Sequence, residues 1–165
     1  MTLPFLVWPL LGLSLAAGLL AGVFLTFSDF LMRALQRSTP QSGTEAMQTL
    51  NREVYRSVFM VLFLGLVPIS ALVLVYGQLW LTGPASLWLS VAGALYLMGV
   101  FGVTAAGNVP MNKRLDAMPL AGQAAQGYWP AYVRGWLRWN HVRGAAALGV
   151  SACYAVAALL MAGGA

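Results

Sequence analysis

Four long apolar stretches alternate with polar segments along the chain, at about residues 3–27, 57–76, 86–106 and 142–161. Each is long enough for a helix to cross a bilayer, which requires about 20 predominantly apolar residues. The composition agrees, since 60% of the residues are hydrophobic and 8% are charged, against about 25% charged residues in an average soluble domain. We therefore predict an all-α fold, in which residues 1–165 form a single domain built as a four-transmembrane-helix bundle.

Amphipathic helices are expected to extend this bundle on one membrane face. Ser42 to Glu45 fit a capping box, and we expect a helix from Thr44 to run unbroken into the second apolar stretch. One side of that helix is apolar except for one asparagine, at Met47, Asn51, Val54 and Val58. The charged neighbours are expected on the solvated side: Arg52, Glu53 and Arg56.

A second extension precedes the last apolar stretch and covers Tyr128–Arg143. Pro130 suits the first position of a helix, so we expect a helix to begin there after a loop over residues 116–126. At the end of the third stretch, Pro110 biases the residue before it away from helical geometry. This predicts that the third helix stops near Asn108 and that Asn112 caps the turn that follows.

The basic residues give the expected orientation. All nine Lys and Arg lie in the first and third segments between the apolar stretches, with Arg143 at the boundary of the last stretch. In a chain with four spans these segments share one side, which the positive-inside rule identifies as the cytoplasm, and both termini then face outside. We expect a bacterial inner membrane protein. Its net charge of +5 is expected to attract membrane lipid and not nucleic acid, because the basic residues flank apolar spans.

Several polar side chains at the charged ends of the spans have two interpretations each. Asp29 lies four residues before Arg33, so it is either half of a surface ion pair or a carboxylate facing the mouth of the bundle. Asn51 is either a clamp between helices or a ligand-facing amide, because a buried amide needs a hydrogen-bond partner. His141 is either an interfacial side chain or a proton acceptor, since histidine titrates near neutral pH.

Familiar catalytic motifs are missing from the sequence. One histidine, one cysteine (Cys153) and four scattered carboxylates show no metal-ligand spacing, so we predict no metal site and no disulfide within the chain. A haem held by two histidines of one chain is excluded, whereas a single axial ligand at His141 stays open. Nucleophilic triads, P-loops and dinucleotide fingerprints are not found.

The remaining candidate site is the charged mouth of the bundle, which is rich in amides and aromatic rings and contains one fixed cation. These groups suit an aromatic ligand that develops negative charge on an oxygen atom during a reaction. The candidate catalytic residues are Arg143, Asn140, His141 and Asp29. The candidate substrate-binding residues are Asn51, Asn108, Asn112 and Trp136.

Four short patterns follow one another along the chain: Phe27-Ser28-Asp29-Phe30, Met47 to Asn51, Asn108-x-Pro110-x-Asn112 and Trp136-x-x-x-Asn140-x-x-Arg143. This ordered set resembles the anthrone-oxygenase-like integral membrane family, over nearly the whole chain. The resemblance implies oxidation of an anthrone to an anthraquinone with O2 and without a recognised cofactor. It concerns Trp136, Asn140 and Arg143 most closely, while His141 occupies a position that the family pattern does not include.

Two functions of different classes remain open. The first is a cofactor-independent oxygenase acting on a hydrophobic aromatic small molecule, phenolic or anthrone-like, that enters from the bilayer. The second is a non-catalytic membrane protein that binds a lipid, a quinone or a partner subunit, with the polar residues as clamps between helices. Assembly into a homo-oligomer is compatible with both.

Overall fold

Four long helical rods make up the protein in a computed structural model that describes residues 4–120 and 123–163. Within these residues the chain is helical with no strand, which confirms the all-α prediction. After a short 3₁₀ turn (Pro4–Leu6), the first rod consists of α1 (Val7–Thr26), a π-helical turn (Phe27–Leu31) and α2 (Met32–Arg37). After the separate helix α3 (Pro40–Glu53) and a 3₁₀ turn (Val54–Arg56), the second rod is α4 (Val58–Leu79).

The third and fourth rods complete the bundle. The third runs through α5 (Pro84–Ala94), two π-helical segments (Leu95–Gly102 and Thr104–Asn108) and α6 (Val109–Asp116), and the fourth is α7 (Gln123–Ala162). The rods contain 31, 22, 33 and 40 residues, and each has an apolar window long enough to cross a membrane. The protein is therefore an integral membrane protein, as the apolar pattern predicted. The first residue of the expected first span, Leu3, lies outside the described residues.

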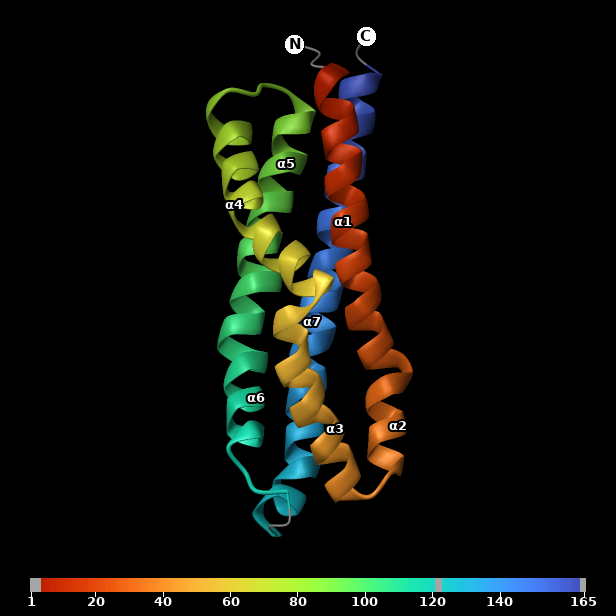
Figure 1. Ribbon diagram of the computed structural model, residues 1–165. Helices are drawn as coiled ribbons and strands as arrows, with labels where there is room; N and C mark the ends of the chain where they lie inside the picture. The colour runs from red at the N-terminus through yellow and green to blue at the C-terminus, as the bar shows by residue number, and fades with distance from the viewer. Residues whose placement is uncertain (1–3, 121–122, 164–165) are drawn as a thin grey trace.

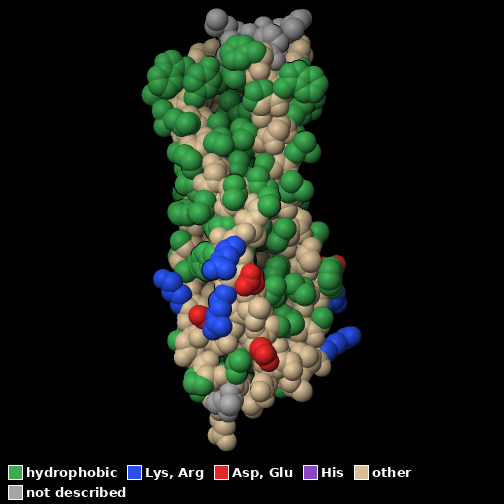
Figure 2. Space-filling model, viewed as in Figure 1, with side chains coloured by type: hydrophobic (Ala, Val, Ile, Leu, Met, Phe, Trp, Pro, Cys, Tyr) green, Lys and Arg blue, Asp and Glu red, His purple; other side chains and the backbone are tan. Residues whose placement is uncertain are grey.

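The bundle has an apolar half and a charged half. In Figure 1, α1 and α7 lie side by side, α4 and α5 pack beside them at the end near both termini, and α2, α3 and α6 surround α7 at the opposite end. The Lys, Arg, Asp and Glu side chains visible in Figure 2 all lie in this second half. Because the apolar half alone is free of charge, the charged half projects from one membrane face, as the amphipathic extensions predicted.

Each half has its own core. The membrane core gathers apolar side chains of α1, α4, the third rod and α7, among them Leu20, Phe24, Phe63, Tyr96 and Tyr154. The projecting core consists of Met32, Met47, Leu115, Trp129, Tyr132, Val133 and Trp136. Most aromatic side chains of the extension Tyr128–Arg143 are therefore packed inside the protein. Trp129 and Trp136 do not anchor α7 at the interface between lipid and water.

The expected unbroken helix from Thr44 into the second span is wrong. α3 begins at Pro40 with Thr39 as its N-cap, whose hydroxyl accepts a hydrogen bond from the Ser42 backbone N–H at 3.2 Å, so Ser42 is not the cap. After Glu53 and one 3₁₀ turn the chain becomes extended at Ser57 (φ −97°, ψ 156°). The Ser57 hydroxyl accepts from the Met60 N–H at 3.3 Å and starts α4 as a new helix.

The third helix does not stop near Asn108, because it continues through Pro110 to Asp116. Pro110 falls in the first turn of α6, directly after a π-helical segment whose shifted backbone pairing accommodates a residue without an N–H. Asn112 is consequently inside a helix and caps nothing. α7 likewise begins at Gln123, within the stretch expected to be loop, so Pro130 is inside α7 and not at its first position.

α3 is attached to the rest of the charged half by three contacts. The Gln48 side chain donates to the carbonyl oxygens of Leu115 and Met118 at 2.8 and 3.0 Å. Arg52 forms an ion pair with Asp116 at 2.8 Å. Gly43 faces Trp129 so closely that a Cβ atom at this position would lie 2.6 Å from the ring. These contacts fix α3 across the end of the third rod and α7.

Candidate functional site

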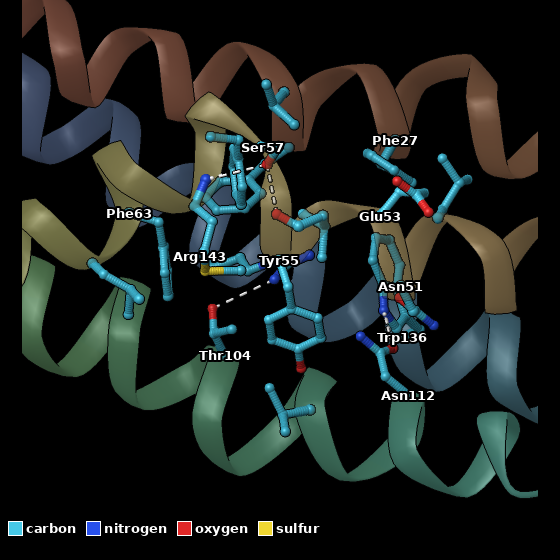
Figure 3. A pocket seen from close by; sticks show the side chains of 18 of the residues that line it. Phe27, Asn51, Glu53, Tyr55, Ser57, Phe63, Thr104, Asn112, Trp136 and Arg143 are labelled. Atoms are coloured by element: carbon cyan, nitrogen blue, oxygen red, sulfur yellow. Dashed lines mark hydrogen bonds between the residues drawn. The ribbon is translucent and has the colours of Figure 1, made fainter.

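A cavity of about 500 Å³ lies where the apolar and charged halves meet, lined by α1, α3, α4, the third rod and α7 (Figure 3). The break between α3 and α4 contributes to it, since Glu53, Val54, Tyr55 and Ser57 all belong to its wall. The rest of the wall is mainly apolar and includes Phe24, Phe59, Phe63 and Phe101. Its volume lies within the range of small-molecule sites, which are mostly apolar with a few polar groups.

Arg143 places a positive charge in this wall. The side chain is buried, at 8% exposure, and no Asp or Glu of the described residues lies within ion-pair distance. Its hydrogen-bond partners are neutral: Nε and Nη2 donate to Asn140 Oδ1 at 3.0 and 2.8 Å, and Nη1 points to Thr104 Oγ1 at 3.4 Å. Its guanidinium also lies over the rings of Phe24 and Trp136, at 4.4 and 5.0 Å from their centroids.

A buried cation without a counter-ion costs free energy, because desolvation disfavours the charge and neutral partners return only part of that cost. The charge of Arg143 is therefore available to an anionic group that enters the cavity. Arg143 is the only Lys or Arg among the described residues that line it.

Asn140 holds Arg143 in place with a fully hydrogen-bonded amide. Its Nδ2 donates to the Phe24 carbonyl oxygen and to Ser28 Oγ, both at 2.7 Å, and its Oδ1 accepts both bonds from Arg143. An asparagine amide has two donors and two acceptor positions, so this one is saturated. The Phe24 carbonyl lies just before the π-helical turn Phe27–Leu31 and also accepts a hydrogen bond from the Phe27 backbone N–H.

A second polar cluster forms where Asn112 of α6 meets Trp136, which lies two helical turns before Arg143 on α7. Asn112 Oδ1 accepts hydrogen bonds from Tyr132 Oη and from Trp136 Nε1, both at 2.9 Å. Asn108 is buried outside the cavity wall and donates to the Trp136 carbonyl oxygen at 3.2 Å. Both asparagines thus fix Trp136, and Asn112 Nδ2 remains as a further donor beside the cavity.

Asn51 also lines the cavity, and its Nδ2 atom is buried without a hydrogen-bond partner among the described residues. Figure 3 draws Asn51, Asn112 and Trp136 on one side of the cavity and Arg143 with Thr104 on the other.

The structure brings together five of the eight predicted site residues around the cavity wall or directly behind it: Arg143, Asn140, Asn51, Asn112 and Trp136. Asn108 supports Trp136 from outside. Asp29 and His141 lie elsewhere. Asp29 is paired with Arg33 at 3.2 Å with its side chain 64% exposed, and His141 is exposed beside a separate hollow of about 370 Å³ between α1 and α7.

Besides its apolar lining, the cavity has polar side chains that the sequence did not indicate as candidates: Glu53, Tyr55, Ser57 and Thr104. Glu53 was expected on the solvated side, because an unbroken helix turns it away from the apolar stripe. Ser57 directly before an apolar run is an N-cap signal, and reading it as a helix start would have indicated the break beside Glu53. No group of three or more His, Cys, Asp or Glu suited to hold a metal occurs among the described residues.

A family model described as anthrone oxygenase matches residues 52–153, more than half of the chain. The matched stretch begins at the end of α3 and includes Glu53, Thr104, Asn112, Trp136 and Arg143 from the cavity wall. Searches of curated proteins and of solved structures returned no match.

Proposed function

Since the chain belongs to the anthrone oxygenase family, we propose that it oxygenates a phenolic, anthrone-like aromatic molecule in the cavity beside Arg143. The observation that carries this proposal is the buried guanidinium without a carboxylate partner, set in an otherwise apolar wall. A flat, hydrophobic ring system fits the aromatic lining. A carbonyl oxygen of this ring system, once it becomes negative, is attracted by the buried cation.

The role of Arg143 follows from where charge develops. An anthrone carries an acidic CH2 group opposite a ring carbonyl, and loss of a proton from that carbon delocalises the electron pair onto the carbonyl oxygen. A preorganised cation at that oxygen stabilises the anion more than the neutral ketone, which is the requirement for catalysis. Asn140 keeps the guanidinium in a single orientation through its two bonds to Nε and Nη2.

The anion then reacts with O2, which is the oxidant. A C–O bond forms at the deprotonated carbon and gives a hydroperoxide after protonation. Loss of water from this hydroperoxide breaks the O–O bond and the remaining C–H bond and leaves a second carbonyl. One CH2 group and one O2 molecule thus give one C=O group and one water molecule, so no other reductant or oxidant is required.

Asn51 and Asn112 are assigned to substrate binding. Their NH2 groups lie near Trp136, seven residues before Arg143 on α7, which corresponds to about 10 Å along the helix. A fused-ring substrate with a second oxygen at its far end can accept a hydrogen bond there while its carbonyl meets Arg143. The Trp136 ring, held by Asn112, forms part of the aromatic wall that such a ring system would contact.

The position of the cavity suggests the route of the substrate. It lies between the charge-free half and the projecting half, at the depth of lipid headgroups, so a hydrophobic ketone can enter from the bilayer. We place the projecting half in the cytoplasm of a bacterial cell and the termini outside, from the distribution of Lys and Arg.

Oxygen uptake by the purified, detergent-solubilised protein tests the proposal. With anthrone as substrate and a strong chelator present, we expect uptake above the spontaneous rate together with formation of anthraquinone in equal amount. Boiled protein and protein-free micelles serve as controls. Uptake no faster than in these controls, over a panel of hydroxylated anthrones, would refute the oxygenase and leave a binding role for the cavity.

A further inference from the structure

Oxygenation by this route requires a group that removes a proton from the substrate. Of the described residues that line the cavity, Glu53 is the only one with a carboxylate. Asp29 is ion-paired on the surface, and His141 borders the separate hollow between α1 and α7. Neither the proton acceptor expected from the sequence, His141, nor the candidate catalytic carboxylate, Asp29, therefore lines the cavity.

Glu53 is the last residue of α3, beside Asn51 and Val54, which also line the cavity. The ion pairs among the described residues join Asp29 to Arg33 and Arg52 to Asp116, so none involves Glu53. The neighbouring Arg52 is held by Asp116 through both Nε and Nη2, at 2.8 Å each. Its charge is thereby directed to the end of α6 and away from Glu53, which leaves the Glu53 carboxylate free to take a proton.

Glu53 and Arg143 line the cavity from different sides (Figure 3), as a base and a cation acting on one fused-ring ketone must. The acidic CH2 and the carbonyl lie on opposite edges of the central ring, so the base and the cation must approach from different sides. Glu53 comes from α3 at the exposed rim, whereas Arg143 comes from α7 and is buried. Figure 3 labels them on separate sides of the cavity, with Glu53 near Phe27 and Arg143 toward Thr104.

We propose that Glu53 is the general base of the reaction, which is a catalytic assignment that rests on the proposed oxygenase function. The C–H bond of the substrate breaks, an O–H bond forms on the Glu53 carboxylate, and the electron pair passes to the ring and its carbonyl oxygen beside Arg143. Because Glu53 is exposed, the proton can leave to water, and the carboxylate is restored for the next turnover.

The test compares Glu53→Gln with Glu45→Gln, an exposed glutamate of the same helix that does not line the cavity. General bases contribute about 10²–10⁴-fold, so Glu53→Gln is expected to lower kcat by at least 100-fold with little change in KM. Glu45→Gln should match the wild type. Deuterium at the substrate CH2 group should slow Glu53→Gln more than the wild type, and formate should restore part of the activity of Glu53→Ala.

The outcomes separate this inference from the function on which it rests. If Glu53→Gln binds anthrone, measured by quenching of tryptophan fluorescence, and retains more than a tenth of wild-type kcat, Glu53 is not the base although the oxygenase stands. Failure of formate to restore any activity in a Glu53→Ala protein that still binds anthrone would also overturn the assignment. No uptake by the wild type would refute both proposals together.

Discussion

Replacing Arg143 by methionine separates its role in stability from its role in function. Methionine keeps a long, flexible side chain against the rings of Phe24 and Trp136, and it removes the charge and all five N–H groups. We expect a small effect of the substitution on stability and a large effect on activity, because the guanidinium is buried without a carboxylate partner among the described residues.

The change in stability is expected to be small. The two good hydrogen bonds to Asn140 are lost, at about 1.5–3 kcal/mol each for a charged donor. Against this, a desolvated cation disappears, and the penalty for such an ion is several kcal/mol. We expect these contributions to cancel to within about 2 kcal/mol of the free energy of unfolding.

The change in activity is expected to be large. Loss of one oxyanion-stabilising donor costs about 10²–10³-fold in kcat in other enzymes, and Arg143 supplies a full charge in a mainly apolar wall. Oxygen uptake with anthrone measures kcat, and tryptophan fluorescence on heating measures unfolding in the same detergent. Arg138→Met is the matched control, since Arg138 is an exposed arginine of the same helix.

Turnover by Arg143→Met within tenfold of the wild type would refute the assignment of Arg143 to the oxyanion. A loss of more than about 4 kcal/mol of unfolding free energy would instead show that the guanidinium is a structural clamp, because the expected relief from desolvation would be missing.

Three further changes test other parts of the structure. Asn51→Leu removes a buried NH2 group that has no hydrogen-bond partner among the described residues. The melting temperature should therefore stay level or rise, while KM rises for substrates with a second oxygen. A fall of about 2 kcal/mol in stability would identify Asn51 as a clamp between helices. Gly43→Ala places a Cβ atom 2.6 Å from the Trp129 ring and should destabilise the projecting half by about 1–3 kcal/mol, seen as a lower melting temperature; an unchanged melt would contradict the tight contact of α3 with α7. His141→Ala should leave oxygen uptake unchanged, because His141 lies outside the cavity; a tenfold loss would restore it as a candidate base.

The fold could be predicted from the sequence because lipid imposes strict rules. Apolar windows in an otherwise charge-poor chain indicate spans without any knowledge of packing, and the helices that contain them are present in the structure. The predicted helix boundaries were wrong where one local sequence signal is compatible with two structures. Pro110 ends a helix in isolation, yet a preceding π-helical segment accommodates it. Ser42 and Thr39 are both capping residues, and Pro40 after Thr39 decided between them.

The site was less predictable for a different reason. Arg143, Asn140 and Trp136 share a helical stripe, so their proximity follows from spacing alone. The involvement of Glu53 depends on the extended backbone at Ser57 and on the attachment of α3 to the end of α6, through Gln48 and the Arg52–Asp116 pair. Such contacts between distant segments leave no periodic trace in the sequence. Asn140 and His141 both border the hollow between α1 and α7, and only Asn140 is bonded to Arg143 of the cavity wall.

The 40 residues of α7 correspond to a rod of about 60 Å, roughly twice the 30 Å of hydrocarbon in a bilayer. One helix is thus subject to two solvents. Water drives the projecting core together through the hydrophobic effect, which chaotropes weaken, whereas lipid supplies no such force between the helices of the membrane core. We expect urea to loosen the α3 wall of the cavity while the spans remain folded in the bilayer. The protein would then lose ligand binding at urea concentrations at which it is still inserted in the membrane.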